Sequence, residues 1–220
     1  MKNKLFLVVT LALIFTFVLS GCSVIQNFLP TGKAGSTSSN VLFEDDFSKT
    51  SSGWDQVSND SGTTDYKDGT YQILVSQTQY DLWANPGKSF TDVSAEVDAV
   101  MIGGPVDNDF GIICRYTDTS NYYFGIISSD GYYAIGYVLD GKQSIFSEQL
   151  EFSDAIKQNT ESNRIRFDCV GSTLTLYANG TQLTQATDST LTSGDVGLMA
   201  GTFDTAGTNV SFDNFVVKKP

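Results

Sequence analysis

The stretch from Phe110 to Gly141 constrains the fold more than any other part of this 220-residue chain. It contains three runs in which side chains alternate as strands require, at 109–116, 122–128 and 132–139. The last two runs are joined by Asp130 and Gly131, and Asp-Gly between alternating runs is a strong hairpin signal because the turn needs positive φ. We therefore predict an antiparallel meander with apolar or aromatic residues on both faces. One face must pack on a second sheet, and the other is a candidate binding surface.

Alternation recurs through the rest of the chain. Apolar and polar residues alternate at 93–101, 163–170 and 173–178, and 209–218 has the pattern of a closing strand. Turn residues recur about every 8–12 residues, and the only segment with a helical-turn pattern lies near 153–156. This pattern predicts an all-β domain, an antiparallel two-sheet jelly-roll sandwich, over residues 41–220.

Residues 1–21 have the pattern of a bacterial lipoprotein signal peptide. A basic start precedes an apolar run that is short for a membrane span, and Leu19-Ser20-Gly21-Cys22 resembles a lipobox. In a lipobox the Cys22 thiol receives a diacylglyceryl group, whereas the other interpretations are an ordinary signal peptide or an uncleaved anchor. The second half of residues 22–40 is rich in Gly, Ser and Thr, and we predict that the segment is a flexible tether. We expect a lipid-anchored protein on the extracytoplasmic face of a bacterial cell envelope.

Charge and composition exclude several functions. The chain has 25 Asp and Glu against 13 Lys and Arg, for a net charge of −12, which argues against a nucleic-acid partner. It contains no histidine, so Ser-His-Asp and Cys-His catalysis and most zinc sites are excluded. An acidic chain suits neutral or cationic ligands, and the catalytic chemistry that remains uses carboxylates.

Two cysteines lie inside the folded region. Cys114 and Cys169 both fall on the apolar phase of predicted strands, in a chain expected to reach an oxidising compartment. We predict a disulfide between them, with the two residues facing each other on adjacent antiparallel strands. The alternative is a pair of buried free thiols, which pack well as small apolar groups.

Several segments resemble a known superfamily. They are EDDFS (Glu44–Ser48), SGW (Ser52–Trp54), FGIICRYTDTSNYY, SSDGYYAIG, NRIRFDCVGSTLTLYANG, SGDVGLMAGTF and FDNFVV. Their order resembles the concanavalin A-like lectin/glucanase superfamily and, more closely, bacterial extracytoplasmic domains near the 3-keto-disaccharide hydrolase and LamG-like families. The resemblance covers Val41–Val217 and implies a concanavalin A-like sandwich. This fold carries lectins, glycosidases, carbohydrate-binding modules and adhesion domains, so the resemblance does not choose an activity.

A carboxylate motif is incomplete in this chain. Glucanases of the superfamily carry Glu-x-Asp-x-x-Glu on one strand, and the nearest match here is Glu96 and Asp98, followed by Met101 in the third position. The simpler interpretation is that the two acids form the solvated face of an alternating strand. We therefore assign no catalytic residue.

Aromatic residues are the second group of candidates. Sugars bind on aromatic planes, with a few polar groups that fix their orientation. The candidates for a ligand-binding site are Trp83, Arg115, Tyr123, Tyr133, Tyr137 and Arg166. Both arginines are expected to face outward, on neighbouring strands. The alternative is that the aromatic residues, Trp54 above all, fill the core.

Acidic residues suggest a structural calcium ion as an optional group, with no cofactor required. Asp46 and Asp213 lie on the first and last runs, which commonly pair in this fold, and hard oxygen ligands suit Ca²⁺. Asp107, Asn108 and Asp109 share one loop. Asp-rich turns are also ordinary turn chemistry, so both interpretations stand.

Three functions fit these observations. The favoured hypothesis is a cell-envelope lipoprotein presenting a non-catalytic sandwich that binds glycan or another surface polymer. A glycoside-processing hydrolase related to the 3-keto-disaccharide hydrolases would instead need two carboxylates converging in a cleft. A structural or protein-interaction domain without a small ligand would show a flat apolar patch.

Overall fold

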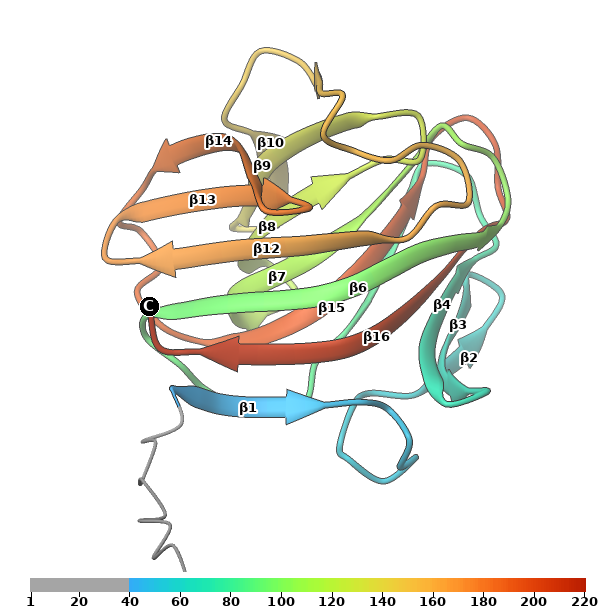
Figure 1. Cartoon of the computed structure of the whole chain (residues 1–220), viewed down its shortest axis with the longest axis horizontal. Helices are drawn as coiled ribbons and strands as arrows, with labels where there is room; N and C mark the ends of the chain where they lie inside the picture. The colour runs from blue at the N-terminus through green and yellow to red at the C-terminus, as the bar shows by residue number, and fades with distance from the viewer. Residues whose placement is uncertain (1–39) are drawn as a thin grey trace, which may run out of the picture. The chain divides into compact units, whose positions relative to one another are not determined.

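Residues 40–220 of the computed structural model form two antiparallel β-sheets packed face to face (Figure 1). This region contains no helix long and apolar enough to cross a membrane. The predicted antiparallel sandwich is therefore confirmed. The predicted signal peptide, Cys22 and nearly all of the predicted tether lie outside the described residues.

The nine-stranded sheet has the order β14-β13-β12-β6-β16-β4-β3-β2, and β1 pairs with β16 as a branch. Its longest strands, β6 and β16, run side by side through its centre (Figure 1). The strands are β1 (Val41–Asp45), β2 (Val57–Asn59), β3 (Gly62–Lys67), β4 (Thr70–Val75), β6 (Val93–Gly103), β12 (Asn163–Val170), β13 (Thr173–Ala178), β14 (Thr181–Thr187) and β16 (Thr208–Lys218).

The seven-stranded sheet has the order β10-β9-β8-β7-β15-β5, and β11 pairs with β9. Its centre is the predicted meander, in which β7, β8 and β9 pair in sequence. The strands are β5 (Tyr80–Ala84), β7 (Asn108–Asp118), β8 (Asn121–Ile127), β9 (Tyr132–Leu139), β10 (Lys142–Ile145), β11 (Glu151–Phe152) and β15 (Asp195–Thr202).

Alternate side chains of both sheets meet in one core. On β6 the odd-numbered residues from Val93 to Met101 are buried, as the pattern predicted, and Phe110 and Ile112 of β7 face them from the other sheet. Burying each large apolar side chain stabilises the fold by roughly 1.5–3 kcal/mol. Trp54 belongs to this core, where its Nε1 donates a hydrogen bond to Asp45 at 2.9 Å.

The predicted disulfide between Cys114 and Cys169 is confirmed, but its position differs from the expectation. Cys114 lies on β7 of one sheet and Cys169 on β12 of the other, so the bond crosses the core between the sheets. The expectation of adjacent strands was wrong because an apolar phase shows that a residue faces the core and does not show which element faces it.

The prediction that Arg115 faces outward was wrong. Arg115 is only 2% exposed, whereas the alternation of β7 placed it on the outer face. It has positive φ (53°), and the pairing of β7 with both neighbouring strands shifts register there, as in a β-bulge. The guanidinium donates hydrogen bonds to the carbonyl oxygens of Leu191 and Gly171 at 2.8 and 2.7 Å, and pairs with Asp92 at 3.4 Å. Arg115 therefore fastens loops at one end of the sandwich.

Removing the disulfide should lower stability without changing the fold. Cys114→Ala combined with Cys169→Ala frees a loop closed over a sequence separation of 55, which costs about 4 kcal/mol on the chain-entropy model. We expect the melting temperature to fall by roughly 8–16 °C, measured by circular dichroism. The untreated and the reduced wild-type protein are the controls. A melting temperature equal to that of the oxidised wild type would contradict the prediction.

Candidate functional site

The outer face of the seven-stranded sheet carries a second apolar cluster. Its buried members include Ile113, Tyr122, Phe124, Val138 and Met199, which come from β7, β8, β9 and β15. They pack on one another on the side away from the main core. The middle of this face is therefore filled by its own side chains, and the expected open, tyrosine-lined surface is absent there.

The sheet curls around this cluster. Gln143 of β10 and Asp81 of β5 stand on the two end strands of the sheet order, yet the Gln143 amide donates a hydrogen bond to the Asp81 carboxylate at 3.0 Å. Neighbouring strands are about 4.8 Å apart, so a flat sheet of this width would hold these residues more than 20 Å apart. The curl brings side chains of opposite edges together.

Asp81 and Asp109 form an acid pair on this face. Gly201 of β15 pairs with Asp109 of β7 on one side and with Asp81 of β5 on the other. A Cβ at Gly201 would lie 2.2 Å from an Asp81 oxygen and 2.5 Å from an Asp109 oxygen, so only glycine fits beneath the pair. Two oxygens this near one point are no more than about 5 Å apart, so the two carboxyl groups are close neighbours.

The environment raises the pKa values of both acids. Burial, and next the negative charge of Asp81, raises the pKa of Asp109 well above its usual value. Burial also raises the pKa of Asp81, against the opposing effect of the hydrogen bond from Gln143. The Asp109 Oδ1 atom is buried and accepts no hydrogen bond. The acid pair is therefore a desolvated site with unused hydrogen-bonding capacity.

An open groove of about 470 Å³ lies where the strands of this sheet end. We call it the strand-end groove; its lining residues are Asp107, Ser128, Asp130, Tyr132, Gln149, Leu150 and Phe203. Tyr132 is 40% exposed and packs edge-on against Phe152, with 5.6 Å between ring centroids. The groove therefore combines an accessible aromatic ring with carboxylate, amide and hydroxyl groups.

Asn108 fixes the loops that form the groove. Its buried side chain donates hydrogen bonds to the Pro105 carbonyl at 2.6 Å and the Ser129 hydroxyl at 3.1 Å, and it accepts one from the Ser129 amide at 3.0 Å. These bonds join the loop before β7 to the turn after β8. Asp107, on the first of these loops, and Asp130, on the turn, are held at the same end of the sheet.

The strand-end groove adjoins the acid pair. Phe110 pairs with Ile127, so the next antiparallel position places Ser128 beside Asp109. Asp107 and Phe203, two residues from Asp109 and Gly201 respectively, line the groove. Acid pair and groove therefore lie at the same end of the sheet and together make up the candidate site.

Most of the predicted ligand-binding tyrosines point elsewhere. Tyr123 and Tyr133 are buried in the main core, where their hydroxyls bond to Asp188 and to Glu151, the latter at 2.8 Å. Tyr137 packs against that core and lies 5.0 Å from the Phe146 ring. These three tyrosines therefore belong to the core or pack against it, as the alternative to a ligand-binding role predicted.

Trp83 and Arg166 lie on different sheets. Trp83 is half-buried on the same face as Asp81 and packs on Tyr122, with 5.7 Å between ring centroids. Arg166 lies on β12 of the other sheet, stacked 3.5 Å from the Tyr177 ring centroid. Of the predicted residues, Trp83 is therefore the one nearest the candidate site.

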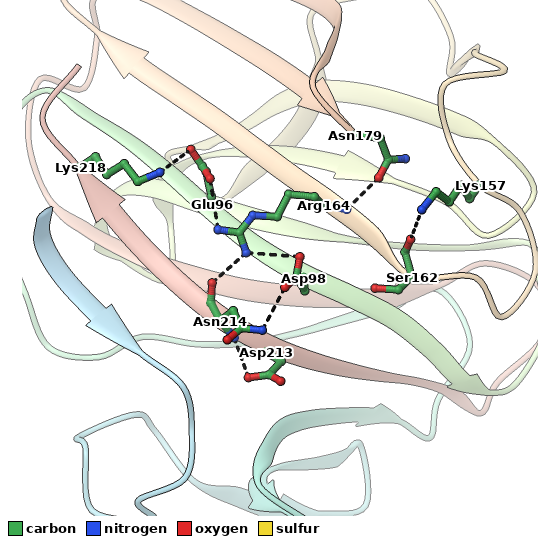
Figure 2. Close-up of polar contacts among 9 residues, drawn as sticks. All are labelled: Glu96, Asp98, Lys157, Ser162, Arg164, Asn179, Asp213, Asn214 and Lys218. Carbon is green, nitrogen blue, oxygen red and sulfur yellow. Dashed lines mark hydrogen bonds and ion pairs between the residues drawn. The ribbon is translucent and has the colours of Figure 1, made fainter. Parts of the chain in front are cut away.

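The incomplete carboxylate motif lies on the outer face of the nine-stranded sheet (Figure 2). Glu96 pairs with Arg164 at 3.1 Å and with Lys218 at 3.0 Å. Burial raises the pKa of Glu96, but hydrogen bonds from Lys218 and Arg164 together outweigh burial and lower it. A carboxylate held ionised in this way joins three strands and is poorly suited to donate a proton.

The remaining members of this cluster are also occupied. Asp98 pairs with Arg164 at 3.3 Å and accepts a hydrogen bond from the Asn214 amide at 3.0 Å (Figure 2). Met101, in place of the third acid, is buried on the opposite face of β6. The interpretation of Glu96 and Asp98 as a polar outer face fits these contacts.

The calcium prediction for Asp46 and Asp213 stays a prediction. Asp46 accepts hydrogen bonds from Ser48, and Asp213 accepts one from the Asn214 backbone at 2.7 Å. Within residues 40–220, no group of three or more His, Cys, Asp or Glu side chains is placed to hold a metal ion. A bound ion would therefore need backbone or amide oxygens as its main ligands.

The sequence analysis missed Asp81, Tyr132 and Phe203 as candidates. Asp81 had a usable signal, because it stands two positions from Trp83 and strand alternation puts both on one face. Tyr132 and Phe203 have no such signal, since each lies at a strand end whose neighbours come from distant segments.

Known structures share this architecture. The carbohydrate-binding module CBM66 from Bacillus subtilis aligns with a TM-score of 0.62 and 18% identity, over 76% of this chain and 96% of that chain. A structure described as a native glycosidic hydrolase aligns with a TM-score of 0.59 and 13% identity, over 81% and 95%. The GlcNAcα1-4Gal-releasing endo-β-galactosidase from Clostridium perfringens aligns with a TM-score of 0.57 and 9% identity, over 82% and 62%. At these identities the likeness establishes a concanavalin A- and galectin-like jelly-roll fold.

The family follows from the sequence match. Residues 38–218 match the 3-keto-alpha-glucoside-1,2-lyase-like domain, so the chain belongs to that family. This confirms the resemblance to the 3-keto-disaccharide hydrolase group. Comparison with curated proteins gives no significant match.

Replacing Asp109 should change how stability depends on pH. Its pKa is raised in the folded protein, so the folded chain binds more protons than the unfolded chain above pH 3.8, and stability falls as pH rises. Between pH 4 and pH 8 we expect the free energy of unfolding to fall less in Asp109→Asn than in the wild type. The difference is about 1.4 kcal/mol for each tenfold by which the folded chain binds this proton more tightly than the unfolded chain. Urea unfolding at several pH values measures this. Asp60→Asn, at an exposed carboxylate, is the control, and parallel profiles for wild type and Asp109→Asn would contradict the assignment.

Proposed function

We propose that the protein is a cell-envelope lipoprotein whose sandwich binds a glycan, without catalysis, at the strand-end groove. Carbohydrate-binding and glycosidase-like domains share this fold and family, which supports a carbohydrate ligand. Cys22 and the Gly/Ser/Thr-rich tether support presentation from a membrane surface.

One observation carries this proposal. The strand-end groove places the exposed ring of Tyr132 next to the oxygens of Asp107, Asp130 and Gln149. A sugar ring offers apolar C–H faces and a rim of hydroxyls, so an aromatic plane bordered by acceptors is complementary to it. Glu96 and Asp98, by contrast, are already neutralised by basic partners.

A second candidate is glycoside hydrolysis, which the acid pair favours. Asp81 and Asp109 lie close enough for a nucleophile and an acid, and the raised pKa of Asp109 suits a proton donor. Binding is preferred because Asp109 is buried and Asp81 is held by Gln143, which limits access of a glycosidic bond to both carboxyls.

Removing the exposed ring of the groove should weaken binding. Tyr132→Ala deletes the sugar-stacking surface, and we expect roughly tenfold lower affinity for a polysaccharide that binds the wild type, about 1.4 kcal/mol. Affinity electrophoresis against a panel of polysaccharides identifies the ligand, and titration calorimetry gives the constants. Leu42→Ala removes an equally exposed apolar side chain, 40%, on β1 of the other sheet and should leave affinity unchanged.

Two results would overturn the proposed function. Lack of binding to every polysaccharide at millimolar sugar concentration would remove glycan recognition. Release of reducing sugar by the wild type and not by Asp81→Asn would replace binding with hydrolysis.

The membrane anchor has its own test. Cys22→Ser in the full chain removes the thiol that would carry the lipid, and we expect the protein to move from the membrane to the soluble fraction. Metabolic labelling with a fatty-acid analogue, followed by fractionation, measures this. Equal labelling of wild type and Cys22→Ser would contradict lipidation at this residue.

A further inference from the structure

The candidate site gathers four carboxyl groups that have no basic partner. Asp107 and Asp130 line the strand-end groove, and Asp81 and Asp109 form the acid pair beside it. No Lys or Arg lines the groove. Every ion pair within residues 40–220 uses other carboxylates, at Asp92, Glu96, Asp98 and Asp168.

The acid pair also has fewer hydrogen-bond donors than its oxygens can accept. Gln143 donates to one oxygen of Asp81, while Asp109, 6% exposed, has a buried Oδ1 without any partner. An unpaired buried acceptor is unfavourable, and more so when it is charged. A ligand that brings both positive charge and several N–H groups would remove this cost.

Three kinds of group could fill this role, and they differ in fit. A calcium ion takes six to eight oxygen ligands, whereas the acid pair supplies two carboxylates, and among residues 40–220 no third acidic, His or Cys side chain is placed to join them. A sugar hydroxyl supplies a single donor and no charge. A primary ammonium supplies three donors and one positive charge, and the nearby Trp83 and Tyr122 rings attract cations.

We infer that the strand-end groove and the acid pair together take a glycan with free amino groups, such as a glucosamine oligosaccharide. This inference rests on the proposed glycan-binding function and names its ligand class. The sugar ring lies against Tyr132 in the groove, and an ammonium group reaches the acid pair from the side of the partly exposed Asp81. Anionic polysaccharides are repelled by the carboxylates of Asp107 and Asp130 in the groove.

The test compares two tetrasaccharides of equal length, β-1,4-linked glucosamine and its fully N-acetylated form, by titration calorimetry at pH 6.5. The glucosamine tetramer has free amino groups, which can carry positive charge, whereas the nitrogens of the N-acetylated tetramer are neutral amides. We expect the wild type to bind the glucosamine tetramer at least tenfold more tightly. In Asp81→Asn and Asp109→Asn the preference should fall below threefold. Asp60→Asn changes an exposed carboxylate in the turn between β2 and β3 of the other sheet and should keep the full preference.

Controls separate this inference from simpler explanations. Spermine tests charge alone, and binding as tight as that of the glucosamine tetramer would overturn the inference. Calcium at 1 mM tests a metal site. The inference would also be overturned if calcium displaced the tetramer from the wild type and raised the melting temperature of the wild type but not that of Asp109→Asn. Melting curves establish that each variant is folded, and Asp81→Asn keeps the test valid if Asp109→Asn does not fold.

The inference and the proposed function fail differently. Equal affinity for the two tetramers, or binding of neutral polysaccharides alone, removes the amino-sugar preference and leaves glycan binding in place. Absence of binding to any glycan removes both.

Discussion

The hydrogen bond between Gln143 and Asp81 joins the two end strands of the seven-stranded sheet, and the candidate site depends on the curl that allows it. The curl has an apolar cause: side chains of the second cluster, such as Phe124 and Met199, leave water by packing on the outer face of their own sheet. Closing the middle of that face leaves the strand ends as the accessible part. The strand-end groove lies there, and Asp109 of the acid pair is buried beside it.

The acidic side chains on the two outer faces differ in whether they have basic partners. On the nine-stranded sheet, Arg164 and Lys218 compensate Glu96, and Arg164 also compensates Asp98 (Figure 2). On the seven-stranded sheet, Asp109 is more deeply buried and has no basic partner. The first arrangement stabilises a sheet and has little left to offer a ligand. In the second, burial of Asp109 is unfavourable and raises its pKa, and groups with shifted pKa values are often found at functional sites.

Strand alternation predicted most of the fold because it depends on local geometry. The ranges 132–139, 163–170 and 173–178 agree with β9, β12 and β13 residue for residue. The short polar strands β2 and β3 had too few apolar residues to be recognised, and they form because β4 supplies hydrogen-bond partners. The candidate site was largely missed, because Tyr132, Phe203 and Asp81 come from separate segments.

The sequence by itself determined the sandwich, the buried phase of each long strand and the pairing of Cys114 with Cys169, since periodicity and composition are carried by neighbouring residues. Only the tertiary structure decided which sheet each cysteine joins, and that a bulge turns Arg115 inward to bind backbone carbonyls. It also decided that Asp81 meets Asp109 over Gly201. Each of these depends on sheet curvature and strand order, which arise from contacts between segments far apart in the chain.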